Sequence, residues 1–187
     1  MDDEALLEQC RRGDGAAFEA LLLRHQSAFF SLALRILTNH EDAMDALQDS
    51  CIKAWRGIAE QRGGAFRSWM NSIVARTCVD RIRARRPTAP LEDEDDRVIA
   101  LPDPQPGPEL LALSRERVHA IEVALGRLSP DHRAVILMRD LSGLSYEEIA
   151  ASLELPIGTV RSRLARARSG LQAELLSLDP NILEAFA

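Results

Sequence analysis

The chain has 187 residues, of which 46% are hydrophobic and 28% are charged, and its formal net charge is −6. This composition is that of an ordinary globular protein and excludes disordered and collagen-like chains. Because no segment approaches the roughly 18 consecutive apolar residues that span a bilayer, the sequence predicts no membrane insertion and a cytoplasmic location.

Cysteine and histidine are too scattered to form a metal site. Cys10, Cys51 and Cys78 match no CxxC spacing, and no two histidines form a ligand pair. The three thiols are expected to be reduced. A nucleophile–base pair and a phosphate-binding glycine loop are also missing from the sequence. We therefore predict no metal, no cofactor and no enzymatic activity.

Four helices are predicted in the first part of the chain. Apolar residues recur there at three- and four-residue spacing, and the abundance of Ala, Leu, Arg and Glu favours helix over strand. Asn39 is expected to cap the third helix, and Pro87 to end the fourth. The expected helices are Asp3–Arg12, Ala16–Leu37, His40–Gly57 and Phe66–Arg86.

Residues 88–108 differ in composition from both sides. They contain LEDEDD followed by LPDPQPGP, so that acidic side chains and prolines dominate. Proline blocks helix and like charges repel, which predicts an extended, flexible linker between two small helical domains. Since most of the net negative charge lies in this linker, the flanking domains remain compatible with a nucleic-acid partner.

The second domain is predicted to contain a helix-turn-helix between Leu144 and Leu171. Ser145 and Glu148 fit a capping box, and a second helix follows from Ile157 to about Leu175. Two further helices, Leu110–Leu128 and Pro130–Asp140, precede this pair, with Ser129 as a candidate N-cap.

The second helix of this pair is predicted to have one apolar side and one basic side. Val160, Leu164, Ala167 and Leu171 form the apolar stripe. The outer side suits the major groove, because arginines reach phosphates or guanine edges and hydroxyls donate to either. Arg168 lies near the apolar edge, and for it a structural and a DNA-binding role are equally open. The candidate DNA-contacting residues are Thr159, Arg161, Ser162, Arg163 and Arg166.

Two features of the first domain also point to function. The helix Phe66–Arg86 combines arginines with Trp69, and Trp55 lies upstream; basic groups beside aromatic rings suit single-stranded DNA. For the two tryptophans we favour core positions, and for the run Arg81–Arg86 we favour nucleic-acid contact. Asp45, Gln48 and Asp49 share one helix face, a pattern that is weak when taken alone.

Taken together, these segments resemble an RNA polymerase sigma factor of the extracytoplasmic function (ECF) type, in the sigma-70 family. GDGAAFEALLLRH, AMDALQDSCIKAW and FRSWMNSIVARTCVDRIR resemble sigma region 2, and LSPDHRAVILMRDLSGLSYEEIAASLELPIGTVRSRLARARSGL resembles region 4. The resemblance implies an alternative sigma factor that binds core RNA polymerase and directs promoter-specific initiation at −10 and −35 elements, under control of an anti-sigma factor. It implies region 2 at 1–87, the linker at 88–108, region 4 at 109–175 and a tail at 176–187.

The resemblance also implies roles for individual residues. Asp45, Gln48 and Asp49 would dock on the beta-prime clamp helices of polymerase, while region 4 would contact the beta flap. The loop Ala59–Phe66 would capture a flipped base, and the helix Ile157–Leu171 would read the −35 element. The acidic linker would occupy the path of nascent RNA. The implied −10 residues are Arg62, Gly63, Phe66, Arg76, Asp80 and Arg83.

One position departs from the family pattern. Family members often carry Asn seven residues after the tryptophan of the FxxW motif, where this chain has Arg76, although Asp80 and Arg83 are retained. An alternative hypothesis is therefore a sigma mimic, an interaction protein that sequesters an anti-sigma factor without reading DNA. A second alternative, a repressor or activator with only the C-terminal fold, leaves the first ninety residues unexplained.

Overall fold

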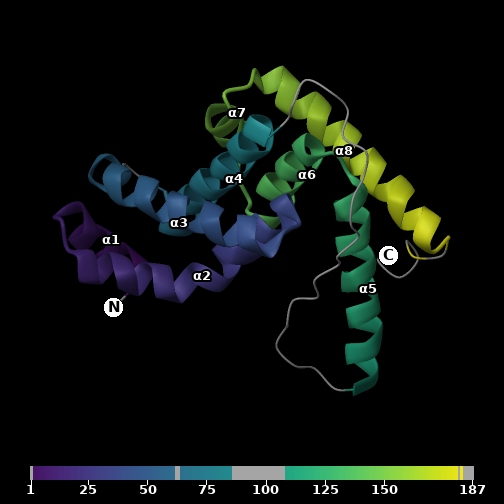
Figure 1. The fold of residues 1–187 in the computed structure, drawn as a ribbon, viewed down its shortest axis with the longest axis horizontal. Helices are drawn as coiled ribbons and strands as arrows, with labels where there is room; N and C mark the ends of the chain where they lie inside the picture. Colours follow the sequence, from purple (N-terminus) through teal and green to yellow (C-terminus); the bar gives the residue numbers. More distant parts are fainter. Residues whose placement is uncertain (1, 62–63, 86–107, 181, 183–187) are drawn as a thin grey trace.

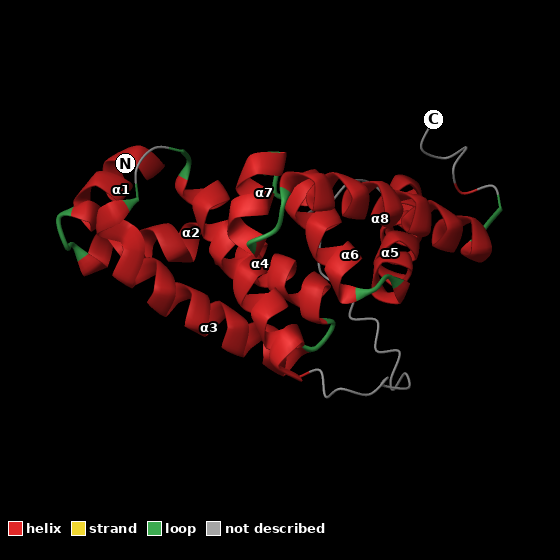
Figure 2. Cartoon of the chain, turned by 90° about the horizontal axis from the view of Figure 1, so that it is seen from above, coloured by secondary structure: helices red, strands yellow, loops and turns green. Residues whose placement is uncertain are grey.

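The computed structural model describes residues 2–61, 64–85, 108–180 and 182. Most of the predicted linker lies outside these residues, as do Arg62, Gly63 and the predicted helix stop at Pro87. Within the described part of the chain every regular element is helical, which confirms the predicted all-α class (Figure 2).

Four helices form the N-terminal block: α1 (Asp3–Arg11), α2 (Gly15–Leu37), α3 (His40–Gly57) and α4 (Phe66–Arg85), with a short 3-10 turn, η1 (Ile58–Glu60), after α3. All four match the predicted helices to within one residue at each described end. Asn39 caps α3 as predicted, because its Oδ1 accepts a hydrogen bond from the backbone N–H of Asp42 at 3.1 Å.

The core of this block lies between α2, α3 and α4 (Figure 1). Its large side chains are almost fully buried, and α1 closes one end through Leu6 and Leu7. Because α2 and α4 are long, they contribute most of these side chains and run the length of the block. The largest are Leu21, Phe29, Leu32, Ile36, Phe66, Met70 and Val74.

The C-terminal block consists of α5 (Pro108–Arg127), α6 (Pro130–Ile136), the π-helical turn η2 (Leu137–Leu141), α7 (Tyr146–Leu153) and α8 (Ile157–Leu178). The helix predicted over Pro130–Asp140 thus changes to π geometry halfway, where the Ser142 N–H donates to the Leu137 carbonyl at 3.0 Å. Ser129 holds the N-cap position of α6, but its side chain makes no capping hydrogen bond.

The last helix is longer than predicted, and its C-terminal end packs on α5. Ala124 of α5, Leu175 of α8 and Ile182 form a small buried cluster there. Helix α8 continues to Leu178, three residues beyond the predicted end, and Leu176 and Leu178 are exposed. Of the tail residues 176–187, positions 181 and 183–187 lie outside the described residues.

The two blocks pack against each other and share one continuous buried cluster. Helix α4 lies beside α7, and α2 contacts α5 and α6, an arrangement that Figures 1 and 2 show from two directions. The sequence did not predict this contact. No helix among the described residues is both long and apolar enough to cross a membrane.

Candidate nucleic-acid and polymerase interfaces

The helix-turn-helix of α7 and α8 begins at a reciprocal capping box. Ser145 Oγ accepts from the Glu148 N–H at 3.1 Å, and Glu148 Oε2 accepts from the Ser145 N–H at 2.7 Å, as predicted. The turn that follows α7 places Glu154 at a φ of 53°, and the Leu155 N–H donates to the Ala150 carbonyl at 3.0 Å. These local bonds fix the direction in which α8 leaves the turn.

The inner faces of both helices are buried as the apolar pattern predicts. Ile149 and Leu153 of α7 are buried, and so are Val160, Leu164 and Ala167 of α8. Ala150 and Leu171 are partly buried against the same core. Burial of this stripe leaves the opposite side of α8 for contacts outside the domain.

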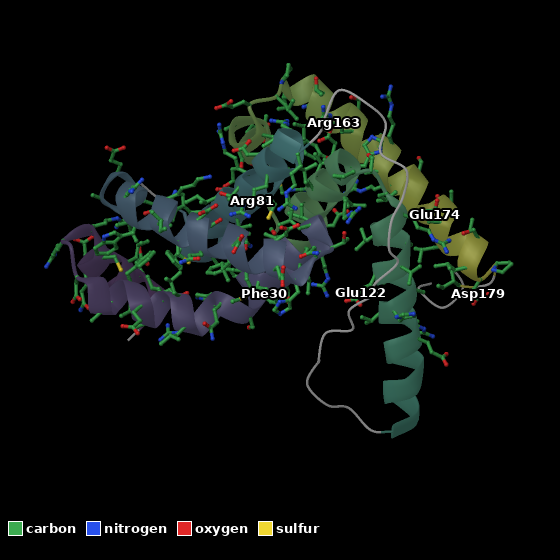
Figure 3. The ribbon with its side chains drawn as sticks, in the orientation of Figure 1. Phe30, Arg81, Glu122, Arg163, Glu174 and Asp179 are labelled. Atoms are coloured by element: carbon green, nitrogen blue, oxygen red, sulfur yellow. The ribbon has the colours of Figure 1, made fainter. Side chains whose placement is uncertain are left out.

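The outer face of α8 carries the predicted −35 residues, which differ in exposure and in their ion pairs. Arg161 is exposed, with its guanidinium 6.0 Å from the Tyr146 ring centroid, and Arg163 is half-buried with a 3.6 Å ion pair to Asp131 (Figure 3). Arg166 is exposed and takes part in none of the ion pairs among the described residues.

Two hydroxyls share this face with the arginines. Thr159 is half-buried and Ser162 is exposed, and Ser162 Oγ donates to the Thr159 carbonyl at 3.0 Å. This bond within the first turn of α8 satisfies the donor locally. The face therefore presents hydroxyl and guanidinium groups together.

Arg168 has a structural partner. Its guanidinium forms two hydrogen bonds with the Asp140 carboxylate, at 2.7 and 3.3 Å, and these bonds raise the pKa of Arg168. The pair connects α8 to the π-helical turn η2. For this residue the structure supports the structural interpretation that the sequence left open.

An open pocket lies between the end of α3, η1 and α4. Its volume is about 610 Å³. It combines one aromatic ring, Trp69, with the cationic side chains of Lys53 and Arg76. Lys53 Nζ donates to Thr77 Oγ1 at 3.0 Å and so connects its two sides. The pocket is lined by Lys53, Gly57, Glu60, Gln61, Trp69, Ile73, Arg76, Thr77 and Asp80.

The sequence analysis identified Trp69, Arg76 and Asp80 but missed Lys53 and Thr77. Lys53 and Gly57 are four residues apart on α3, while Trp69, Ile73, Thr77 and Asp80 follow helical spacing on α4. These two rows of helical spacing were the signal that could have identified Lys53 and Thr77. Reading it required knowledge that α3 and α4 pack side by side, which no local pattern provides.

Phe66, the first residue of α4, is 1% exposed. Its ring centroid is 6.3 Å from that of Phe18 and 6.2 Å from that of Trp69. Trp55 is 39% exposed, and its ring lies tilted by 47° against that of Phe18 at a centroid distance of 5.2 Å, so it is only partly a core residue; Trp69 is half-buried. In this conformation the Phe66 ring is covered and does not line the pocket.

The loop before α4 is anchored at Gln61. Arg11 Nη2 donates to Gln61 Oε1 at 2.6 Å, Arg11 Nε donates to the Gln61 carbonyl at 3.1 Å, and Gln61 Nε2 donates to the Gly64 carbonyl at 3.3 Å. Arg62 and Gly63, two predicted −10 residues, lie outside the described residues. Arg83 is exposed on the last turns of α4.

The predicted polymerase-binding face lies on the exposed side of α3. The side chains of Asp45 and Asp49 are 64% and 47% exposed, and Gln48 lies between them. Arg81 of α4 holds both carboxylates, donating to Asp49 at 2.7 Å and to Asp45 at 3.4 Å (Figure 3). The bond to Asp49 is the main reason that the pKa of Arg81 is raised.

Arg85 makes a similar contact. Both of its terminal nitrogens donate to the Asp42 carboxylate, which lowers the pKa of Asp42. Arg81 and Arg85, which the sequence placed in a nucleic-acid-binding run, are therefore engaged by α3 in this conformation. The ion pairs connect the polymerase-binding face to the helix that is predicted to read DNA.

Apolar side chains accompany the acidic ones on α3. Met44 and Ile52 are 52% and 46% exposed, and with Gln48 they follow four-residue spacing along the helix. The sequence analysis did not single them out. Apolar groups surrounded by polar ones are the usual composition of a protein–protein contact surface.

The described residues contain no cluster of three or more His, Cys, Asp or Glu side chains that could hold a metal ion. The three cysteines are free thiols, and burial raises the pKa of Cys78 to about 12.

Comparison with known proteins gives two family matches. Residues 21–88 match the family model "Sigma-70 region 2", and residues 119–171 match "Sigma-70, region 4". The chain is 34% identical over 184 residues to the RNA polymerase sigma-H factor of Pseudomonas aeruginosa, with 94% of this chain and 95% of that protein covered. It is 35% identical over 187 residues to the ECF RNA polymerase sigma-E factor of Escherichia coli strain K12, with 95% and 96% covered.

Two solved structures are also similar. CnrH in complex with the cytosolic domain of CnrY matches with a TM-score of 0.60 at 29% identity, over 95% of this chain and 98% of that chain. The sigma factor RpoE in complex with the anti-sigma factor NepR from Bartonella quintana matches with a TM-score of 0.62 at 30% identity, over 87% and 98%. The protein therefore belongs to the ECF group of the sigma-70 family of RNA polymerase sigma factors, which are transcription initiation factors and not enzymes.

Proposed function

We propose that this ECF sigma factor uses three separate surfaces during initiation: the exposed side of α3 for polymerase, the α4 pocket for the −10 element, and the outer face of α8 for the −35 element. The observation that carries the proposal is the pocket, which brings Trp69, Lys53 and Arg76 together from two helices. In this scheme region 2 is residues 1–87, the linker 88–108, region 4 residues 109–175, and the tail 176–187.

The α3 surface is suited to a protein partner. Asp45, Gln48 and Asp49 supply acceptors and an amide, while Met44 and Ile52 supply apolar area beside them. We assign this surface to the beta-prime clamp helices and assign a region 4 contact to the beta flap. Docking would exchange the Arg81 bonds to Asp45 and Asp49 for bonds to basic groups of polymerase.

The α4 pocket is suited to an extruded base. Trp69 offers a ring on which a base can stack, and Lys53 and Arg76 offer positive charge to the adjacent backbone. Asp80 and Arg83 continue this surface along α4, and we assign Arg62, Gly63 and Phe66 to the same −10 contact. Because removing a base from the duplex costs a few kcal/mol, a preformed pocket favours melting at the sequence it accepts.

The face of α8 is suited to the major groove of duplex DNA. Arg166 and Arg161 are exposed and can reach phosphates or guanine edges, while Thr159, Ser162 and Arg163 complete the face. The expected partners are thus core RNA polymerase and promoter DNA, in the cytoplasm where both are found. The similar RpoE structure is a complex with an anti-sigma factor, which supports an anti-sigma factor as the regulator of this protein.

Transcription reconstituted from core polymerase and this protein tests the proposal. Promoters are selected from genomic fragments by permanganate footprinting of melted thymines. Asp49→Ala is expected to lower core affinity. Trp69→Ala is expected to spare core binding and reduce melting, because it removes the stacking surface. Arg166→Ala is expected to weaken promoters that depend on their −35 element.

Arg127→Ala is the matched control for loss of an arginine, since Arg127 lies on α5 and pairs with Glu174, away from all three surfaces. A sigma mimic would bind an anti-sigma factor tightly, and core polymerase with the mimic would melt no promoter. That outcome would overturn the proposal.

A further inference from the structure

Two hydrogen bonds fasten α7 to α4, and so join the C-terminal block to the N-terminal one. Arg76 Nη2 donates to Glu154 Oε1 at 2.5 Å, and Ser152 Oγ donates to the Ser72 carbonyl at 3.0 Å. Ser72 and Arg76 are four residues apart and share a face of α4. The helix-turn-helix therefore lies along the side of α4 that carries Arg76.

A second junction lies between α2 and the start of the C-terminal block. Arg133 is 5% exposed and donates at 3.0 Å to the carbonyls of Gly126 and Leu128 within its own block. It also donates to the Ile36 carbonyl of α2 at 3.4 Å. Arg35 of α2 forms a 3.4 Å ion pair with Glu122 of α5, which Figure 3 labels. The two junctions hold the blocks at separate points.

The closed arrangement is incompatible with reading two promoter elements at once. Centres about 25 base pairs apart lie about 85 Å apart along duplex DNA, at about 3.4 Å per base pair. Helix α8 has 22 residues and so is about 33 Å long. Because α7 touches α4, no part of α8 reaches a −35 element while α4 lies on the −10 element. The blocks must separate before both elements are bound.

Glu154 also occupies the Arg76 guanidinium, which DNA would need for binding. Arg76 lines the α4 pocket, and its guanidinium binds the Glu154 carboxylate, which offers the same kind of oxygen acceptor as a phosphate. The Glu154 side chain is 70% exposed and the Arg76 side chain 40%, so the pair is open to solvent. A polyanion can thus compete directly for Arg76.

We propose that the Arg76–Glu154 ion pair is a latch that holds the free protein closed, with the −10 surface engaged by its own helix-turn-helix, until uptake by polymerase separates the blocks. The inference rests on the assignment of α4 and α8 as promoter readers. Arg76, which also forms a 3.7 Å ion pair with Asp80 on its own helix, then exchanges Glu154 before initiation for nucleic acid during it.

The size of the effect follows from the exposure of the pair. An exposed ion pair shifts an equilibrium by about two- to fivefold and is screened by salt. The latch therefore biases the free protein toward the closed form without locking it, which leaves the blocks free to separate when polymerase binds both.

Distance measurement between spin labels tests the latch in the full-length protein. Labels are placed at Glu19→Cys on α2 and Gln172→Cys on α8, both exposed, in a Cys51→Ser background, since Cys10 and Cys78 are buried. We expect one dominant short distance at low salt. Glu154→Gln should lower the closed-to-open ratio about two- to fivefold, and Arg76→Glu should lower it further.

The charge swap makes the test specific. Arg76→Glu combined with Glu154→Arg should restore the closed population to within about twofold of the parent, since the pair is re-formed with reversed polarity. Glu147→Gln, another exposed acid on α7, should leave the distances unchanged. Equal distance distributions in the parent and in Glu154→Gln would overturn the latch, as would failure of the swap to restore closure.

Transcription at limiting protein concentration separates this inference from the proposed function. If opening precedes uptake, Glu154→Gln should raise the apparent affinity for core and promoter by up to about the same two- to fivefold factor. A latch seen by distance measurement with no promoter melting by any variant would refute the promoter-reading assignment alone. Melting by the parent with distances insensitive to Glu154 would refute the latch alone.

Discussion

Arg133 is the most deeply buried charged side chain among the described residues. Its guanidinium has no carboxylate partner and donates instead to the carbonyls of Gly126, Leu128 and Ile36. Burial lowers the pKa of Arg133 to about 10, which reflects the penalty on the charged form. Arg133 thereby satisfies carbonyls at the ends of two helices, which no apolar side chain can do.

Removal of Arg133 should therefore destabilise the protein. Arg133→Met fills similar space but leaves three carbonyls without a donor, so we expect a loss of about 1–3 kcal/mol in the free energy of unfolding, measured by urea denaturation. Arg127→Met removes an exposed arginine and should change stability by less than about 0.5 kcal/mol. Equal stability of the Arg133→Met variant and the parent protein would show that the carbonyls do not depend on Arg133.

Two residues with positive φ offer a paired test of backbone strain. Thr38 ends α2 at a φ of 57°, where a β-branched side chain is disfavoured, and Gly143 precedes the helix-turn-helix at a φ of 71°. Thr38→Gly should stabilise the protein by about 0.5–1 kcal/mol. Gly143→Ala should destabilise it by about 1 kcal/mol although the new Cβ would meet nothing within 4 Å. Thermal unfolding of both variants checks the opposite signs.

At the scale of the element, the capping box of α7 should matter more than the N-cap of α6. Ser145 Oγ accepts a hydrogen bond from the Glu148 N–H, whereas the Ser129 side chain makes no capping bond. Ser145→Ala should cost about 1 kcal/mol of unfolding free energy, and Ser129→Ala should cost almost nothing. Equal losses in the two variants, measured by urea denaturation, would contradict this assignment.

Local signals predicted the helices well and their contacts poorly. Asn39, Ser145 and the stripe Val160–Leu164–Ala167 act through neighbours in sequence, so pattern reading placed them correctly. The π geometry of η2, the continuation of α8 to Leu178 and the partner of Arg168 were not predicted. Among them Arg168 is the clearest case, because Asp140, its partner, lies 28 residues away.

At the scale of the whole molecule, the candidate site was likewise predicted well from local patterns and poorly where it depends on contacts between distant segments. The family resemblance gave the residues on α3, α4 and α8, but Lys53 and Thr77 emerged only when α3 and α4 were placed side by side. Arg76 is the sharpest example. In the sequence it is a departure from a family pattern, and in the structure it binds Glu154, 78 residues away.

The charge distribution of the whole molecule predicts how its promoter binding depends on salt concentration. The net charge is −6, so we expect the free protein to gain little general attraction to DNA and, under the proposed assignment, the arginines of α8 to act when polymerase holds them at the −35 element. On such a promoter, each phosphate neutralised contributes a slope of about −0.9 to log K against log salt concentration. Arg166→Ala should therefore weaken promoter binding by the reconstituted polymerase and reduce the magnitude of this slope by about 1, if Arg166 contacts a phosphate.

The matched control for this experiment is Arg127→Ala, which changes the net charge equally but lies on α5, where it pairs with Glu174 of α8, labelled in Figure 3. It should leave both affinity and slope unchanged, because counterions are released only where a cation meets DNA. A loss of affinity in Arg166→Ala with an unchanged slope would assign Arg166 to a base edge instead of a phosphate, and relaxed preference at one base pair would then accompany it. An unchanged affinity and slope would remove Arg166 from the −35 interface.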